Sequence, residues 1–307
     1  MNKSKKTIIF TGKNSSITKS FINSINFSSY NLYIFTTSKK NTNDEIKNIK
    51  YIYLKKYFSN VNEYKKILSK CSYFFHCAYQ NDENFATKYS YEDYKINIHS
   101  LENILNTIID FKNLNFIFFS TVSLYSSSLK NITEESKIKI LSQYNLHKYY
   151  CEKKIKYFSD ISKPNYIILR TSNLYGDNDL VKRDFILQSL HKIKKNYPIL
   201  IFGSGNYLRD YLHLDDVNKA LKCIIKKRVN IKFEIFNFCS GNSLSINNTI
   251  KKMFYLFRKK ELIKYEPKNN YLIKRNFICK PYKFSKTFKW QAKIDLGLGL
   301  KKLIKKI

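Results

Sequence analysis

The sequence lacks any apolar run close to the roughly 20 residues that a membrane-spanning helix needs. Its first residues are basic, but the apolar stretch that follows ends at Gly12 and is too short for the core of a secretory signal peptide. The chain also has no internal repeat and no linker rich in Pro, Gly or Ser. At 307 residues it can bury a sizeable core. Because it shows neither a membrane-spanning run nor a signal-peptide core, we expect a cytoplasmic protein with no membrane insertion.

The cysteines lack the spacing of a metal site. All six are scattered along the chain, with no CxxC pair and no Cys/His ligand pattern. Buried free thiols in a reducing compartment are the simplest interpretation. We therefore expect no bound metal.

Arginine is scarce in a chain that is otherwise strongly basic. Only 6 of the 56 basic residues are arginine, and the formal net charge is +33. Such a charge often indicates a nucleic-acid or anionic-membrane partner. Here Lys, Asn, Ile, Tyr and Phe are abundant together, as AT-rich codons would produce, whereas phosphate-reading surfaces favour the arginine fork. We expect no specific nucleic-acid partner, and an RNA-binding protein stays an alternative hypothesis.

A tyrosine and a lysine at helical spacing carry the clearest chemical signal. Tyr144 and Lys148 are four residues apart, so a helix would place them on one face. An ammonium beside a phenol lowers the phenol's pKa from its usual value of about 10 and makes it a usable acid/base. Apolar segments at 115–123 and 165–172 flank this helix and predict two buried parallel strands, the first of which carries Thr121 near its end.

The N-terminal segment has the pattern of a dinucleotide-binding turn. A predicted strand at 7–11 leads into Gly12 and an amphipathic segment, which would bring backbone N–H groups and a helix N-terminus to a pyrophosphate. Thr18 stands where a third glycine would allow close packing, and we expect its β-branched side chain to crowd that contact. The residues of this segment expected to bind the cofactor are Gly12, Asn14, Ser15, Ser16 and Ile17.

The second predicted strand, at 31–37, ends without an acidic residue. Such a residue would bind the adenosine ribose and indicate NAD. Ser38, Lys39 and Lys40 follow instead and suit a 2′-phosphate. The cofactor is therefore predicted to be NAD or NADP, with NADP favoured by a small margin.

Several motifs together resemble those of a known family. Thr11 and Gly12 match the start of TGxxGxxG, and Thr121 with Tyr125 precedes the YxxxK pair. Residues 209–217, RDYLHLDDV, match RDxxHxxDv. The chain thus resembles the extended short-chain dehydrogenase/reductase family, of the NAD(P)-dependent nucleotide-sugar epimerase, dehydratase and reductase type. The resemblance spans about 7–300 and is strongest over 116–217.

The resemblance implies a fold class and a division of the chain. The fold would be α/β, a doubly wound parallel sheet (Rossmann-like) with a small C-terminal substrate lobe. The dinucleotide domain would comprise 1–172 with a contribution from about 206–240, and the lobe would comprise 173–205 and 241–307. A homodimer is compatible with the family. Asp215 and Asp216 are expected to cap the helix that follows them.

The resemblance also implies roles for individual residues. His76, in the segment FHCAY at 75–79, is interpreted as a core packing residue and not as a base. Tyr144, Lys148 and Thr121 would be catalytic, with Tyr144 and Lys148 also at the cofactor, where Lys148 would hold the ribose. Additional cofactor contacts would come from Ser38, Ala78 and Asn97. The nucleotide-sugar substrate would be bound by Asn173, Arg209 and Arg275, because a planar guanidinium suits a diphosphate.

The predicted activity is that of an NAD(P)-dependent epimerase or keto-sugar reductase acting on a nucleotide-activated sugar, in cell-envelope polysaccharide precursor synthesis. Val122 and Ser123 stand where 4,6-dehydratases of the family carry an Asp-Glu pair, which disfavours elimination of water. Besides the RNA-binding hypothesis, a catalytically silent dinucleotide-binding relic is an alternative.

Overall fold

The computed structural model divides into two compact units. It describes residues 5–26, 29–40, 48–127, 131–176, 184–227, 231–267 and 275–307. Unit 1 comprises Met1–Leu124, Ile140–Leu169 and Arg228–Phe236, and unit 2 comprises Tyr125–Lys139, Arg170–Lys227 and Asn237–Ile307. The domain boundaries expected from the sequence stay a prediction, and each unit is described by itself below.

A seven-stranded sheet organises unit 1. Its strand order is β10-β6-β5-β4-β1-β2-β3, and the pairs β3–β2, β2–β1, β1–β4 and β4–β5 are parallel. The order 3-2-1-4-5-6 within it is that of a doubly wound dinucleotide-binding fold, so the predicted fold class is confirmed. The strands are β1 (Lys6–Thr11), β2 (Tyr30–Thr36), β3 (Ile49–Tyr53), β4 (Cys71–His76), β5 (Asn115–Thr121), β6 (Asn165–Thr171) and β10 (Phe233–Phe238).

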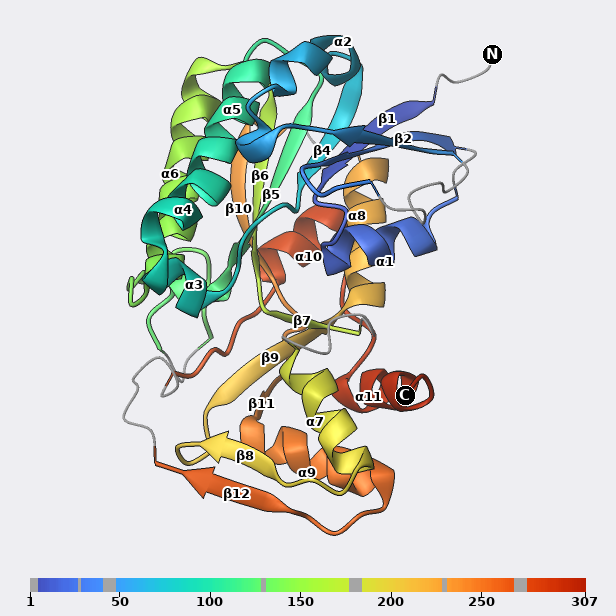
Figure 1. Ribbon diagram of the computed structural model, residues 1–307, viewed down its shortest axis with the longest axis vertical. Coiled ribbons are helices and arrows are strands. Elements are labelled where there is room, and N and C mark those ends of the chain that lie inside the picture. Colours follow the sequence, from blue (N-terminus) through green and yellow to red (C-terminus); the bar gives the residue numbers. More distant parts are fainter. Residues whose placement is uncertain are drawn as a thin grey trace. The chain divides into compact units, whose positions relative to one another are not determined.

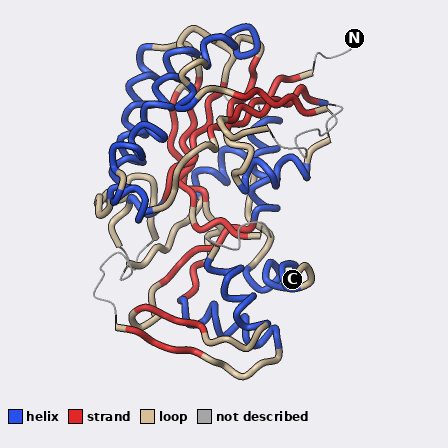
Figure 2. Tube along the Cα trace, in the orientation of Figure 1, coloured by secondary structure: helices blue, strands red, loops and turns tan. Residues whose placement is uncertain are grey.

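Helices cover both faces of this sheet. Figure 1 shows α5 and α6 side by side on one face and α1 on the other, and Figure 2 shows the same layers with helices in blue and strands in red. Among the described residues, no helix combines the length and the apolar composition that a bilayer crossing requires. The helical segments of unit 1 are α1 (Ser16–Ser24), η3 (Lys56–Phe58), η4 (Val61–Tyr64), α2 (Lys65–Leu68), α3 (Glu83–Lys88), α4 (Ser90–Tyr94), η5 (Lys95–His99), α5 (Ser100–Ile108), η6 (Val122–Leu124) and α6 (Gln143–Ile161).

The two faces of the sheet follow from the alternation of side chains along its strands. Ile9 joins a core cluster with Ile104 of α5 and Ile155 of α6, all of them fully buried. The next residue, Phe10, points the other way and packs against Phe21 of α1, with ring centroids 4.9 Å apart and the rings tilted by 33°. Full burial of each such side chain is worth about 1.5–3 kcal/mol, so both helical layers are held by the sheet's apolar residues.

The long helical segment between β4 and β5 is interrupted by one π-turn. The segment α4 continues into η5, where the N–H of Ser100 bonds the carbonyl of Lys95, five residues earlier. Asn97 lies within this turn and is fully buried. A π-turn places one extra residue in the helix and is often found at functional sites.

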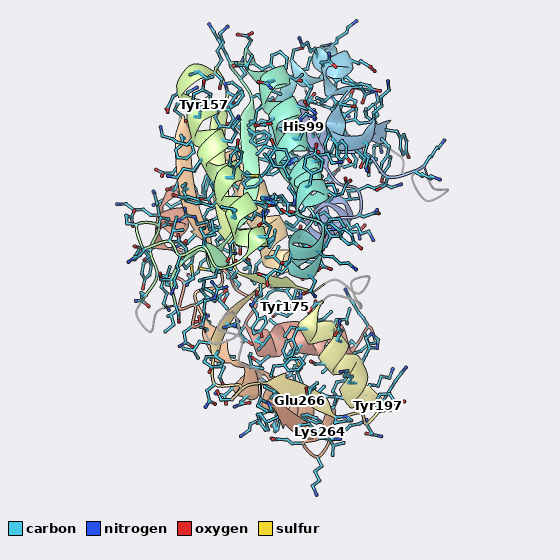
Figure 3. The ribbon with its side chains drawn as sticks, turned by 60° about the vertical axis from the view of Figure 1, so that its left-hand side comes forward. His99, Tyr157, Tyr175, Tyr197, Lys264 and Glu266 are labelled. Carbon is cyan, nitrogen blue, oxygen red and sulfur yellow. The ribbon has the colours of Figure 1, made fainter. Side chains whose placement is uncertain are left out.

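Two small sheets and their helices form unit 2. One sheet has the order β11-β9-β7, and β12 pairs with β8 in the other. In Figure 3, Tyr197, Lys264 and Glu266 lie together at the part formed by β8, β12 and α7, and all three are exposed. The elements are β7 (Asn173–Tyr175), α7 (Phe185–Lys194), β8 (Ile199–Phe202), β9 (Leu208–His213), α8 (Leu214–Lys226), β11 (Ser243–Ser245), α9 (Ile246–Phe257), β12 (Ile263–Glu266), α10 (Tyr282–Phe288) and α11 (Leu296–Ile304).

The cap of α8 differs from the prediction. His213, not either aspartate, precedes the helix, and its Nδ1 accepts the N–H of Asp215 at 3.1 Å. The carboxylate of Asp216 instead accepts the N–H groups of Lys293 and Ile294, at 2.8 and 2.7 Å. The expectation that Asp215 and Asp216 cap the helix is therefore wrong, because both lie inside its first turn, where a side chain can reach other segments.

Candidate active site

The turn after β1 is built for close backbone approach. Gly12 has φ = +80°, and a Cβ atom there would lie 2.9 Å from the Cα of Ala78. Only glycine fits such a position without strain. Ser15 precedes α1 and makes no side-chain capping bond, so its hydroxyl leaves the amides of the first turn to other partners. Ser16 and the buried Ile17 begin the helix, which places all these predicted residues at one turn.

Thr18 is accommodated by a hydrogen bond. Its side chain is fully buried, and its hydroxyl lies 3.5 Å from the carbonyl oxygen of Thr11. Thr11 in turn accepts the N–H groups of Cys77 and Ala78 at 3.0 and 2.9 Å, so β1 stays joined to the end of β4. The β-branched residue therefore replaces glycine with its polar group bonded across the contact it was expected to crowd.

His76 is a packing residue, as predicted. Its Nδ1 lies 2.9 Å from the hydroxyl of Thr11, and its ring stacks against Phe116 and Phe118. Burial lowers the pKa of His76 to about 3, so the ring is neutral at physiological pH. A neutral, buried and bonded imidazole is a poor candidate for the general base.

The end of β2 adds polar groups beside the turn. Asn14 donates to the hydroxyl of Ser38 at 3.2 Å, which brings two predicted cofactor residues together. Lys13 donates to the carbonyl of Lys39 at 2.5 Å, and only 7% of its surface is exposed. The sequence reading did not single out Lys13, although it lies inside the glycine turn.

The three predicted catalytic residues converge in unit 1. Thr121 ends β5, and Tyr144 and Lys148 lie on α6, which Ser142 caps by accepting the N–H of Asn145. The phenol of Tyr144 is hydrogen-bonded to the Thr121 side chain. Hydroxyl and phenol are thus in contact, as acid/base chemistry on a substrate hydroxyl requires.

The Lys148 ammonium is hydrogen-bonded to a backbone carbonyl and covered by an aromatic ring. Its Nζ donates to the carbonyl oxygen of Phe119 at 2.6 Å and lies 3.3 Å from the centre of the Tyr79 ring. Burial lowers the pKa of Lys148 to about 7, and the nearby thiol of Cys151 and carboxyl of Glu152 oppose that shift.

This orientation corrects one expectation. The sequence predicted that Lys148 lowers the pKa of Tyr144, but burial raises the pKa of Tyr144 above its ordinary value, and only the Thr121 hydrogen bond opposes the rise. The reason is geometric. Spacing of four places two Cα atoms on one helix face but does not decide where a long lysine side chain ends.

A small hydrogen-bond network holds Thr121 in place. Its hydroxyl donates to Ser123 at 3.0 Å, and the N–H of Ser123 returns a bond of 3.1 Å. Asn145, the residue after Tyr144, donates to the same Ser123 oxygen at 2.7 Å. The positions that carry an acidic pair in the family's dehydratases thus hold a hydroxyl that orients Thr121.

Asn97 braces the loop that follows β4. Its carboxamide accepts the N–H of Gln80 at 2.7 Å and donates to the carbonyl of Gln80 at 3.0 Å. Both of its polar atoms are thereby used within the chain. Its predicted cofactor contact stays a prediction, and its observed role is to fix the loop that carries Tyr79.

Two buried acidic residues near the site were missed by the sequence reading. Asp93 is fully buried and hydrogen-bonds His147, which lies between Tyr144 and Lys148. Glu152 is also buried and accepts the Ser120 hydroxyl at 2.5 Å. The i, i+4 spacing of Glu152 from Lys148 was a signal that could have indicated it.

The predicted substrate residues lie in unit 2. Arg209 and Arg275 meet at Phe277, whose ring centre is 5.5 Å from the first guanidinium and 5.0 Å from the second. Arg209 also donates to the carbonyl of Arg275. Asn173 begins β7, is exposed, and pairs in register with Tyr211, two residues along β9 from Arg209. Two guanidiniums at one place suit an anionic ligand.

Tyr125, which shares the Thr121 motif, has a structural role. Its ring is fully buried, and its hydroxyl donates to Asn237 at 2.6 Å and accepts from Arg170 at 2.8 Å. These contacts lie within unit 2 and leave no polar atom of the phenol unused.

Comparison with known proteins establishes the family. Residues 8–239 match the NAD dependent epimerase/dehydratase family, so the chain belongs to that family. The predicted membership of this enzyme family is therefore confirmed.

Individual relatives agree with this assignment. The chain is 33% identical over 177 residues to a putative UDP-glucose 4-epimerase of Methanocaldococcus jannaschii, a match that covers 56% of this chain and 55% of that protein. The match thus spans about half the length of that relative. It is 28% identical to a dTDP-4-dehydro-6-deoxyglucose reductase of Escherichia coli over 72% of each chain.

A solved structure shows the same fold. The crystal structure of a UDP-glucose 4-epimerase from Thermotoga maritima, with UDP-glucose, is similar with a TM-score of 0.86 over 97% of both chains. Its identity to this chain is 23%, so the likeness speaks to the fold.

Proposed function

We propose that the chain is an NAD(P)-dependent enzyme that epimerises or reduces a nucleotide-activated sugar. The observation that carries the proposal is the hydrogen bond between Thr121 and the Tyr144 phenol, with Lys148 one turn along the same helix. The expected place in cell-envelope polysaccharide precursor synthesis stays a prediction.

The residues of the glycine turn fit a dinucleotide. Gly12 allows the backbone to approach a ligand, and the uncapped N-terminus of α1 favours an anion such as a pyrophosphate. When bound, the dinucleotide supplies a hydride acceptor or donor for the sugar carbon. Asn14, Ser38 and Lys13 would lie on the adenosine side of the turn, and Lys13 favours a 2′-phosphate there.

The catalytic residues would then divide the proton chemistry among them. Tyr144 takes the proton of the sugar hydroxyl as the carbonyl forms and returns it when the carbonyl is reduced. Thr121 hydrogen-bonds the same sugar oxygen, held by its bonds to Ser123. Lys148 must turn from the Phe119 carbonyl toward the phenol, because a neighbouring ammonium lowers the pKa of Tyr144.

Unit 2 would supply the substrate's anchor. Arg209 and Arg275 place two guanidiniums beside one aromatic ring, and such forks bind diphosphate oxygens in pairs. Asn173 is proposed to bind the sugar end of the same ligand. Val122 and Ser123 offer no acid for water loss, which favours epimerisation or reduction over dehydration.

One observation supports a second candidate, a dinucleotide-binding relic without activity. Lys148 is engaged by the Phe119 carbonyl and covered by Tyr79, and the pKa of Tyr144 is raised. A panel of UDP-, dTDP- and ADP-sugars and their keto forms, each incubated with the chain and with NAD or NADP in both the oxidised and the reduced form, decides between the two. Interconversion of one sugar, or oxidation or reduction of about one equivalent of the nicotinamide, supports the enzyme, and binding without either supports the relic.

A further inference from the structure

The Tyr79 ring covers the amine of Lys148. Tyr79 lies in the loop between β4 and α3, and its ring centre is 3.3 Å from Nζ. The Phe118 ring flanks the same nitrogen at 4.7 Å. Tyr79 also meets Tyr144 edge to face, with ring centroids 6.1 Å apart and an interplanar angle of 85°. One aromatic ring therefore contacts both residues of the YxxxK pair.

The backbone on either side of Tyr79 is fixed. The N–H of Ala78 donates to the Thr11 hydroxyl at 2.9 Å. Gln80 exchanges two hydrogen bonds with the buried Asn97, at 2.7 and 3.0 Å. Because the chain is held before and after the residue, the ring would leave Lys148 by rotation of its side chain and not by movement of the loop.

The hydroxyl of Tyr79 makes the covering position of the ring less stable. The oxygen is buried and has no hydrogen-bond partner among the described residues. An unpaired buried hydroxyl is unfavourable, so the covering position of the ring lacks the polar support that a fixed core tyrosine has. The favourable contact is the ammonium on the ring face.

We propose that Tyr79 is a side-chain gate over Lys148, and that its ring and the ribose hydroxyls of the nicotinamide dinucleotide compete for the Lys148 amine. The inference rests on the proposed function. With the ring in place, the N–H groups of Nζ are directed to the Tyr79 ring and the Phe119 carbonyl, so they are not offered to a ribose hydroxyl. Rotation of the ring frees the amine both for the ribose and for the Tyr144 phenol.

A gate of this kind lowers the apparent affinity by the fraction of molecules in which it is open. Tyr79→Ala removes the ring, so the dissociation constant for the preferred dinucleotide should fall by at least about threefold. Tyr79→Phe keeps the ring and removes the unpaired hydroxyl, so its affinity should equal that of the unmodified chain or be weaker. Calorimetry with NAD and NADP measures all three proteins, after circular dichroism has shown that each is folded.

A second measurement needs no dinucleotide. Reductive methylation of the ligand-free protein, followed by peptide mass spectrometry, reports how accessible the Lys148 amine is. Tyr79→Ala should raise the labelling of Lys148 severalfold, whereas Tyr79→Phe should not. Lys153, exposed on the same helix, is the internal control and should label equally in all three.

The outcomes separate the gate from the proposed function. Unchanged or weaker dinucleotide binding by Tyr79→Ala, with wild-type binding intact, overturns the gate alone. Failure of every variant to bind either dinucleotide overturns the proposed function instead. In that case the labelling still decides whether Tyr79 covers Lys148. Equal labelling of Lys148 in all three proteins would show that the Tyr79 ring does not restrict access to the amine, and the gate would be rejected.

Discussion

Nδ1 of His147 lies 2.5 Å from a carboxylate oxygen of Asp93, and both side chains are buried. The other ring nitrogen lies 2.8 Å from the amide nitrogen of Gln143, which donates to it. In this arrangement Nδ1 of His147 donates to the Asp93 carboxylate. The pair joins α6 to the end of α4, and it fixes the helix that carries Tyr144 and Lys148.

Loss of this bond should destabilise the fold. Asp93→Asn replaces a charge-assisted hydrogen bond with a neutral one, and the free energy of unfolding should fall by about 2 kcal/mol. Urea denaturation measures the change. Asp160→Asn is the matched control, because Asp160 pairs with Lys156 at an exposed position and its loss should change the free energy of unfolding much less. Equal effects of the two variants would contradict the structural role of the buried pair.

Tyr144→Phe tests the acid/base. The ring still packs, so folding and dinucleotide binding should persist, but turnover of the nucleotide sugar should fall by at least about 10²-fold. Tyr150→Phe removes an exposed phenol from the same helix and should leave turnover unchanged. A Tyr144→Phe enzyme as fast as the unmodified chain would remove Tyr144 from the mechanism.

Arg209→Ala tests the substrate anchor. A charge-assisted fork to a diphosphate is worth about 1.5–3 kcal/mol per bond, so KM for the nucleotide sugar should rise roughly tenfold or more. Affinity for the dinucleotide should not change. Lys264→Ala removes an exposed positive charge from the same unit and controls for net charge. An effect confined to the dinucleotide would place Arg209 at the other ligand.

NADP should bind at least as well as NAD. The end of β2 has no carboxylate, so nothing acidic at that position would repel a 2′-phosphate. The Lys13 amine also lies near this strand end, where it bonds the carbonyl of Lys39. Lys13→Met should weaken NADP roughly tenfold and NAD much less, since only NADP loses a charged contact. Calorimetry with both dinucleotides provides the comparison. A clear NAD preference of the unmodified chain would contradict the assignment.

The lowered pKa of Lys148 makes folding stability depend on pH. The unfolded chain holds this proton up to a pKa near 10.5 and the folded chain only to about 7, so between these values the unfolded state binds more protons. The contribution of Lys148 to the free energy of unfolding should therefore increase as the pH rises above 7, and it should decrease again as the pH is lowered to 7. The difference between the unmodified chain and Lys148→Met, measured from pH 6.5 to 8.5 by urea denaturation, isolates it. No difference in slope would show that Lys148 stays protonated in the fold.

The sequence predicted those parts of the site that depend on local pattern. Gly12 followed from a strand and a turn, and the face shared by Tyr144 and Lys148 followed from helical spacing, so both could be read directly. Asp93 and His147 are 54 residues apart and meet only because α4 and α6 pack on the same side of the sheet, so no local signal joins them.

The direction of the Lys148 side chain could not be read for a related reason. Its end is decided by the Phe119 carbonyl and by Tyr79, which reach it from two different strand ends. The spacing of residues along one helix gives no information about either partner, because both belong to other segments. The predicted cap of α8 was wrong for the same reason. His213 forms the cap, and Asp216 accepts a hydrogen bond from Lys293, which is distant in the sequence.

The π-turn at Lys95–His99 is the place in this helix where the chain can best absorb a change in length. It holds one residue more than a regular helical turn, so loss of one residue there would give a continuous α-helix and leave α5 facing the core. Within α5 the same loss has a different effect, because each residue of a regular helix turns the next by about 100° and every later side chain would rotate by that angle. Ile104 and Leu105, both fully buried, would then turn away from the core if a residue before them in α5 were deleted.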